Sequence, residues 1–160
     1  MQLSTAAFGF RATRRRSLSG VLALGAVLAS WAVPVQPSAA PPPKQLIALI
    51  NAAQETPPNG STAQGVGHLT YTDTTKMLCF AISYQGLGSP ELVAHIHGPG
   101  LPGVAAGIAY ALPAGNPKTG CVGPLTTPQK TQLLKNELYI NIHSTTLPGG
   151  EIRGQIMRIK

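Results

Sequence analysis

The sequence predicts an all-β fold, an antiparallel β-sandwich with Greek-key-like connections, about seven to eight strands and one short helix. Three features of the composition indicate this class. Charged residues make up only 11% of the 160 residues, far fewer than in coiled coils or ordinary helical proteins. Hydrophobic residues make up 43%, which is enough for a packed core. The 18 glycines and 15 prolines divide the apolar residues into short runs, as in a sandwich or barrel.

Residues 1–40 are expected to be an export signal outside that fold. The basic segment Arg11–Arg16 precedes an apolar run over Leu18–Val33, and small residues and prolines follow. With two glycines in 16 residues, the run is short for a membrane span. A Sec signal and a twin-arginine signal both fit, and cleavage after Ala32 and after Ala40 both stay open. We therefore expect a periplasmic or secreted protein with no stable membrane span once the signal is removed.

The formal net charge of +7 is concentrated in the signal segment. Four arginines lie within residues 1–40, which contain no acid, so the other 8 basic and 5 acidic residues give only +3. These charges form no basic stripe, so nucleic acid is not an expected partner. The sequence has no Gly-x-Ser-x-Gly nucleophile motif and no Gly-x-x-x-x-Gly-Lys phosphate loop. Hydrolases and nucleotide-binding enzymes are therefore disfavoured.

The remaining chain is expected to form one domain over residues 46–160, after a stiff proline-rich linker over residues 41–45. Short apolar runs between turn residues predict seven strands. The expected strands are Gln45–Asn51, Gly65–Thr72, Met77–Gln85, Leu92–His97, Gly107–Leu112, Leu138–His143 and Glu151–Ile159. Asp73–Lys76 predicts a hairpin connection, and the glycines and prolines of Gly98–Gly103 predict an ordered loop.

One short helix is expected over residues 128–136. Thr127 can cap its start, and Pro128 suits the first helical position. Leu133 and Leu134 supply an apolar face before Asn136. This helix is the only one expected, and it lies between the strands Gly107–Leu112 and Leu138–His143.

The two cysteines, Cys79 and Cys121, are expected to form a disulfide, because an exported protein folds in an oxidising compartment. Their separation of 42 positions gives a bridge worth about 4 kcal/mol in the chain-entropy description. The alternative is two buried free thiols.

Three of the expected strands have one aliphatic face and one polar face, because successive side chains on a strand point to opposite sides. The aliphatic faces carry Leu92, Ala94 and Ile96, then Leu138, Ile140 and Ile142, then Ile152, Gly154 and Ile156. The polar faces carry Val93, His95 and His97, then Tyr139, Asn141 and His143, then Glu151, Arg153 and Gln155. Three of the four histidines therefore share the polar side.

This arrangement predicts a metal site at His95, His97 and His143. Residues two apart on a strand lie about 7 Å apart at Cα and point the same way, so two imidazoles can converge on one ion. A third imidazole from a neighbouring strand completes a three-nitrogen site that suits copper or zinc.

Four further polar-face residues are expected around this site: Asn141, Glu151, Arg153 and Gln155. Glu151 or Gln155 could orient a ligand ring, and Arg153 could attract an anion to an open metal position. The alternative is a hydrogen-bonded network without metal. His68 stands apart and is expected to be an ordinary histidine, either at the surface or in a hydrogen-bonded network.

Several motifs resemble those of the CHRD domain, a family named after chordin and common in secreted bacterial proteins. The resemblance runs from about Leu46 to Ile156. Its motifs are Ala53–Pro58, Ala94–Pro99, Leu138–His143 and Pro148–Gln155. It implies an extracytoplasmic β-sandwich and little about activity.

A more distant resemblance is to copper–zinc superoxide dismutases, whose copper site also has a His-x-His strand, a later strand histidine and an arginine. His95, His97, His143 and Arg153 are similar in order and kind. The bridging histidine and the zinc-ligand set have no counterpart here, so the expected site is mononuclear.

Three functions therefore stay open. The first is a metal-binding module. The second is a superoxide dismutase-like enzyme using that metal, although a role without catalysis is favoured. The third is a structural module without metal that holds an extracellular protein or a cell-surface polymer.

Overall fold

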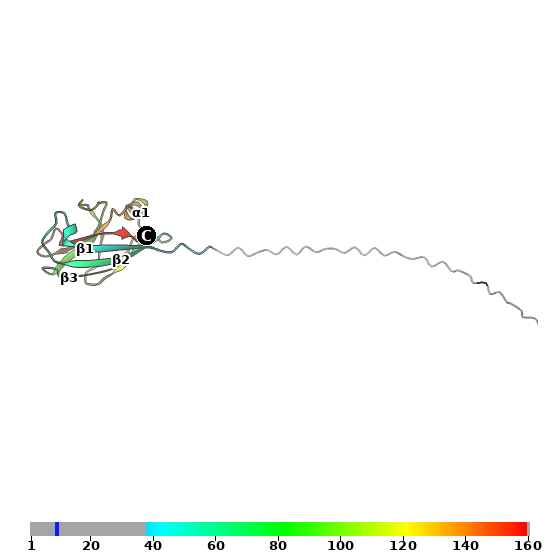
Figure 1. Ribbon diagram of the computed structural model, residues 1–160, viewed down its shortest axis with the longest axis horizontal. Helices are drawn as coiled ribbons and strands as arrows, with labels where there is room; N and C mark the ends of the chain where they lie inside the picture. Colours follow the sequence, from blue (N-terminus) through cyan, green and yellow to red (C-terminus); the bar gives the residue numbers. More distant parts are fainter. Residues whose placement is uncertain (1–8, 10–37, 160) are drawn as a thin grey trace, which may run out of the picture. The chain divides into compact units, whose positions relative to one another are not determined.

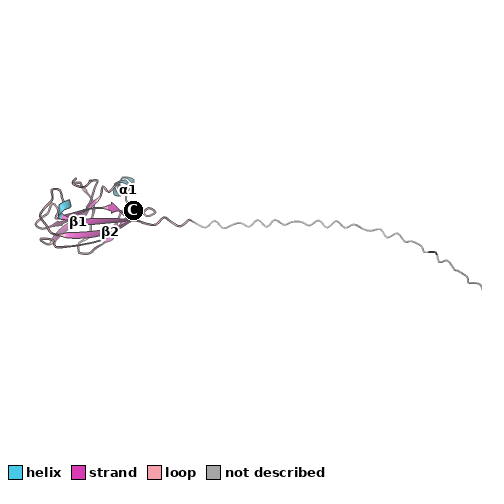
Figure 2. Cartoon of the chain, viewed as in Figure 1, coloured by secondary structure: helices cyan, strands magenta, loops and turns pink. Residues whose placement is uncertain are grey.

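The computed structural model describes Gly9 and residues 38–159. Within these residues the chain is built mainly of strands, with two short helices (Figure 2). The strands are β1 (Lys44–Asn51), β2 (Gln64–Thr72), β3 (Met77–Gln85), β4 (Glu91–His97), β5 (Ile108–Ala111), β6 (Lys118–Val122), β7 (Tyr139–Ser144), β8 (Ile152–Gln155) and β9 (Met157–Arg158). The helices are η1 (Ala52–Gln54), a 3-10 turn, and α1 (Thr127–Leu134). The all-β prediction is confirmed.

The strands form an antiparallel sheet in the order β5-β4-β7-β8-β1-β2-β3-β6, and β9 pairs with β1 beside this path. Strands β1, β2 and β3 lie side by side as a meander (Figure 1). The neighbours β4 and β7, like β3 and β6, are far apart in sequence, as in Greek-key connections.

The sheet folds over so that two layers face each other. A methyl group added to Gly67 of β2 would lie 2.9 Å from Cδ1 of Ile140 in β7, so these strands pack face to face. The layers join where β8 meets β1 through the pair Asn51 and Arg153. There Gly154 allows the close approach, because a Cβ would lie 2.7 Å from the carbonyl oxygen of Leu49.

The hydrophobic core fills the space between these layers. Its buried side chains come from alternate positions of the strands, as the sequence pattern predicts. They include Leu46, Ala48, Ile50, Leu69, Tyr71, Leu78, Phe80, Ile82, Ala94, Ile96, Ile140, Ile142 and Ile152. Leu92, which was expected in the core, is 52% exposed, because the register of β4 shifts between Glu91 and Val93.

One strand was not predicted, and one expected strand is divided in two. Strand β6 was missed because only Lys118 of its five residues is buried, so it has no apolar alternation. The last expected strand divides after Gln155, where the N–H of Ile156 donates to the carbonyl of Leu138.

The expected helix is present with a different cap. It runs over Thr127–Leu134, and its N-cap is Thr126 rather than Thr127. The Thr126 hydroxyl accepts from the N–H of Gln129, whose side chain in turn accepts from the N–H of Thr126. This reciprocal capping box fixes the start of the helix.

Cys79 of β3 and Cys121 of β6 lie directly opposite each other and form the expected disulfide. It fastens the edge strand β6 to the meander. The expected linker, residues 41–45, overlaps the start of β1 at Lys44.

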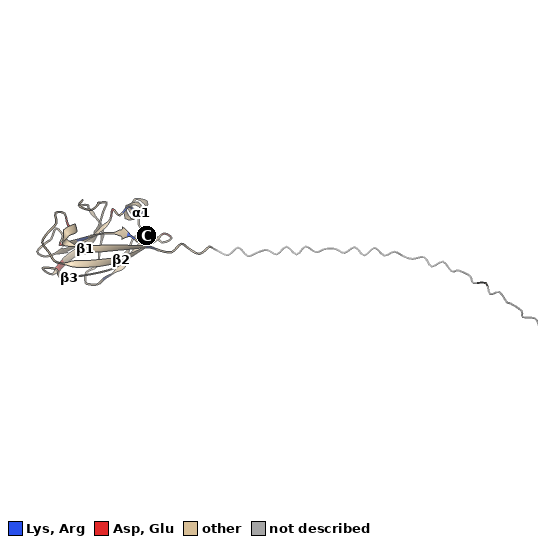
Figure 3. Ribbon diagram, viewed as in Figure 1, with Lys and Arg blue, Asp and Glu red and all other residues tan. Residues whose placement is uncertain are grey.

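Charged residues are sparse along the ribbon of the described domain (Figure 3). Lys44 and Lys130 both pair with Asp73, and the buried Lys118 pairs with Glu91. Among the described residues, no helix is long and apolar enough to cross a membrane. The expected signal lies almost entirely outside the described residues.

Candidate metal centre

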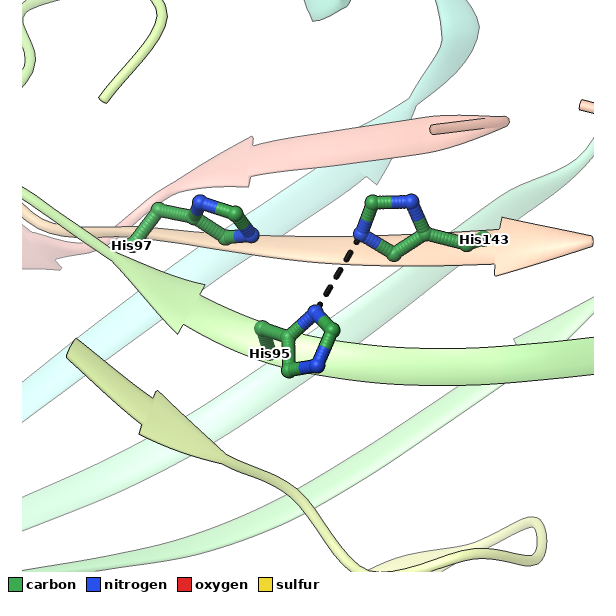
Figure 4. A group of neighbouring side chains, drawn as sticks. All are labelled: His95, His97 and His143. Atoms are coloured by element: carbon green, nitrogen blue, oxygen red, sulfur yellow. Dashed lines mark hydrogen bonds between the residues drawn. The ribbon is translucent and has the colours of Figure 1, made fainter. Parts of the chain in front are cut away.

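The three histidines come from adjacent antiparallel strands. His95 and His97 lie on β4, and His143 lies on β7. Residues paired across these strands share a face, and the pairs are His95 with Asn141 and Val93 with His143. Figure 4 shows the three rings on one side of the two strands, directed toward one another. The pleat therefore brings together the residues that the sequence singled out.

One potential ligand nitrogen from each ring lies within 4.8 Å of the others. Nδ1 of His95 lies 3.4 Å from Nε2 of His143. The ring centroids are 5.2 Å apart for His95 and His143, 5.5 Å for His95 and His97, and 6.0 Å for His97 and His143. Two nitrogens bonded to one ion at about 2 Å each can be no more than about 4 Å apart. Small ring rotations would therefore bring all three onto a single ion.

Backbone carbonyls fix the tautomers of two rings. Nδ1 of His97 lies 2.9 Å from the carbonyl oxygen of Ala106, and Nδ1 of His143 lies 2.9 Å from that of Pro148. A carbonyl only accepts, so each Nδ1 carries the hydrogen and each Nε2 keeps a lone pair. Nε2 of His97 is buried without a hydrogen-bond partner among the described residues. A histidine held this way is prepared to coordinate a metal.

The environment favours neutral imidazoles. Burial lowers the pKa of His95, and the rings of His143 and His97 lower it further. Burial also lowers the pKa of His97, although its hydrogen bond to Ala106 opposes the shift, while His143 and Arg153 add to it. Neutral rings offer the lone pairs that a metal requires.

Loops cover the polar face on which these rings lie. His97 and His143 are each only 8% exposed, and Arg153 is 1% exposed. Arg153 donates from Nη1 and Nη2 to loop carbonyls and to two side chains. These acceptors are Thr56 Oγ1 at 3.2 Å, Val104 O at 3.0 Å, Leu101 O at 3.0 Å and Gln155 Oε1 at 3.2 Å. The guanidinium therefore holds the loop that follows β4 against the sheet.

A stack of side chains connects Arg153 to the histidines. The guanidinium carbon lies 3.5 Å from the centroid of the Tyr139 ring. Tyr139 in turn stacks on His97, with centroids 5.1 Å apart and planes 9° apart. The Tyr139 hydroxyl accepts from the N–H of Ala106, whose carbonyl holds His97. Tyr139 thus fixes both the ring and its carbonyl partner.

Glu151 and Gln155 bind groups other than the histidine rings. Gln155 donates from Nε2 to the carbonyls of Gly100 and Asn136, at 2.8 and 2.7 Å. Glu151 accepts from the Ser61 hydroxyl at 2.6 Å and the N–H of Gly88 at 2.7 Å. These side chains were expected to orient the histidine rings, but backbone carbonyls orient them instead. The fourth histidine, His68, lies exposed on β2, as expected.

The family model of the CHRD domain matches residues 46–156. The chain belongs to the CHRD domain family. No curated protein and no solved structure matches it. The match includes all three clustered histidines, and it confirms the resemblance that the motifs indicated.

One buried residue of this CHRD domain was not expected near the cluster. Glu55 follows η1 and is 7% exposed, and its Oε2 accepts from Nδ2 of Asn141 at 3.2 Å. Burial raises the pKa of Glu55 and outweighs the lowering by Asn141, Arg153 and the N–H of Thr56. Its position before Pro57 and Pro58, in a rigid loop, was the signal in the sequence. The sequence around Glu55 does not predict that its carboxyl group contacts Asn141.

Proposed function

We propose that this CHRD domain is an exported module that binds one copper or zinc ion through His95 Nδ1, His97 Nε2 and His143 Nε2. The observation that carries the proposal is Nε2 of His97. It is a buried acceptor without a partner, on a ring whose other nitrogen is held by a carbonyl. A buried polar atom left unpaired costs about 1–3 kcal/mol, and a metal ion would remove that cost.

The donor set supports a transition metal of intermediate softness. Three neutral imidazoles, with no thiolate and no carboxylate among them, suit copper or zinc better than calcium or magnesium. Divalent copper binds a given nitrogen site more tightly than zinc does. We therefore expect copper to displace zinc when both are supplied.

Metal analysis tests the proposal directly. The protein is purified without an affinity tag from the exported fraction, dialysed with copper or zinc, and assayed for bound metal. One ion per chain is expected, and His97→Ala should abolish it. His68→Ala is the matched control and should retain the ion, because His68 lies exposed on β2. Loss of less than half the metal in His97→Ala would refute the site.

Export is proposed on separate grounds. The arginine-rich start and the apolar run over Leu18–Val33 have the order of a signal segment, and the Cys79–Cys121 bond suits an oxidising compartment. Cell fractionation with intact-mass measurement would locate the protein and its processed start. Recovery of the unprocessed chain in the cytoplasm would contradict the proposal.

The runner-up is a module without metal whose histidines fasten loops and whose surface holds an extracellular protein or a cell-surface polymer. The hydrogen bonds from His97 to Ala106 and from His143 to Pro148 favour it, because they tie the loops after β4 and β7. Unfolding with and without metal separates the two functions. A ligand at a hundred times its dissociation constant stabilises the fold by about 2.7 kcal/mol, whereas this module would gain nothing.

The position of Arg153 argues against superoxide dismutation. Such an enzyme needs a cation that draws the anion to the open metal position. Arg153, the residue expected to supply it, is buried and donates to four protein acceptors.

A further inference from the structure

A pocket of about 380 Å³ opens beside the most exposed ring of the histidine cluster. His95, Val93 and Ala111 belong to its lining. Val93 is paired with His143 and Ala111 with His95, so both side chains lie on the same side of the sheet as the rings. The loops that bury His97 leave Val93 42% exposed. The pocket is therefore the open side of the cluster.

The lining of this pocket is mostly apolar and carries no free charge. Leu92 and Val93 belong to the lining, and the small residues Ala111, Ala114 and Gly115 leave room beside them. Glu91 is the one acidic residue in the lining, and its two oxygens are taken by Lys118 and the Tyr84 hydroxyl. No lysine or arginine belongs to the lining. These walls suit an uncharged molecule, and the volume lies at the small end of ligand pockets, which span about 300–1,000 Å³.

His95 is the member of the histidine cluster that lines the pocket, and its Nε2 is the nitrogen that makes no contact with His143. In Figure 4 Nδ1 of His95 points to His143, and the other ring nitrogen lies on the far side of the ring from it. Nε2 of His143 holds a lone pair, because its Nδ1 donates to Pro148. Nδ1 of His95 must therefore be the donor of their contact, which leaves a lone pair on Nε2 of the metal-free protein. That nitrogen has no partner among the described residues and accepts a hydrogen bond.

From this geometry we infer that the pocket binds a small, uncharged, largely apolar molecule with one hydroxyl group, and that this hydroxyl donates to Nε2 of His95. A phenol or a hydrophobic alcohol has this chemistry. The apolar body lies against Leu92, Val93 and Ala111. The inference concerns the metal-free protein and does not depend on the proposed metal function.

Fluorescence titration with naphthol and with its methyl ether tests the inference. The two probes have the same aromatic body, but only naphthol can donate a hydrogen bond. The titration uses the full exported protein with a chelator present, so metal binding plays no part in the result. Naphthol should bind about threefold to tenfold more tightly than the ether, the range expected of one net hydrogen bond. His95→Phe should remove this preference.

A matched pair of tryptophan substitutions tests the location. Ala111→Trp fills the pocket from the exposed edge strand β5 and should weaken naphthol at least tenfold. Ala81→Trp is the control on β3, where Ala81 is exposed away from the pocket, and should bind naphthol as the unmodified protein does. Circular dichroism of both variants verifies the fold. Equal binding of naphthol and its ether, or unchanged binding in folded Ala111→Trp, would overturn the inference.

Discussion

Nδ2 of Asn141 donates to the Glu55 carboxyl group at 3.2 Å, across 86 positions of sequence. Oε1 of Glu55 and Oδ1 of Asn141 are both buried without a hydrogen-bond partner among the described residues. Both oxygens lie within 2.8 Å of the place where a Cβ on Gly150 would be. Two acceptors cannot satisfy each other unless one of them carries a hydrogen. A protonated Glu55 would pair with both ends of the Asn141 amide.

Glu55→Gln should therefore leave the fold as stable as before or make it more stable at neutral pH. A glutamine amide can donate to Oδ1 of Asn141 and accept from its Nδ2 without a proton from solution. Because the pKa of Glu55 is raised, its favourable contribution exists below the unfolded pKa and disappears as pH rises through the folded pKa. The urea midpoint of the unmodified protein should therefore decrease as pH rises through this range, while the midpoint of Glu55→Gln should not change. Glu137→Gln, in the loop between α1 and β7, is the control and should preserve the fall.

Arg153→Lys should lower the free energy of unfolding by about 3 kcal/mol. Lysine cannot supply parallel donors to the carbonyls of Leu101 and Val104, and it loses the planar stack on Tyr139. Hydrogen exchange of residues 98–107 should also become faster, because these carbonyls anchor that loop. Arg158→Lys, an exposed change on β9, should alter neither quantity. Equal stabilities of the two variants would contradict the anchoring role.

Lys118→Met should destabilise the protein by about 3–5 kcal/mol. The Lys118 side chain is fully buried and donates to Glu91 and to the carbonyls of Pro113 and Gly115, both at 2.9 Å. Its removal leaves the Glu91 carboxylate without its cation. The double variant Glu91→Leu with Lys118→Met should recover part of the loss, because an apolar pair has no charge to desolvate. Thermal unfolding measures the three proteins, and a double variant no more stable than Lys118→Met would refute this account.

Copper should remove the preference for naphthol over its methyl ether if both proposals hold. A metal on Nδ1 of His95 takes its lone pair and leaves the hydrogen on Nε2, which then donates and no longer accepts. The hydroxyl oxygen of naphthol and the ether oxygen can then both accept from Nε2, so the preference for naphthol over its ether should disappear in the copper-loaded protein. Repeating the fluorescence titration after metal loading measures this change. A preference that persists with copper bound would show that the ion lies elsewhere than on Nδ1 of His95.

The strands were predictable because their burial follows the pleat. Ile140, Ile142 and Ile152 alternate with polar residues in the sequence and are fully buried. Strand β6 gave no such signal, because it is held by pairing with β3 and by the Cys79–Cys121 bond rather than by an apolar face. The exposure of Leu92 was not predictable for a similar reason, because it follows from a register shift that the residue types do not indicate.

By itself the sequence determined the all-β class, the family motifs and the common face of His95, His97 and His143, because side-chain direction on a strand depends only on the parity of the residue number. Only the tertiary structure decided which groups hold those rings. Every residue has a backbone carbonyl, so residue type does not single out Ala106 and Pro148 as the partners of the rings. The contact between Glu55 and Asn141 depends on how distant loops close over the sheet. Long-range packing, which local patterns do not encode, therefore set the tautomers, the burial and the open side of the cluster.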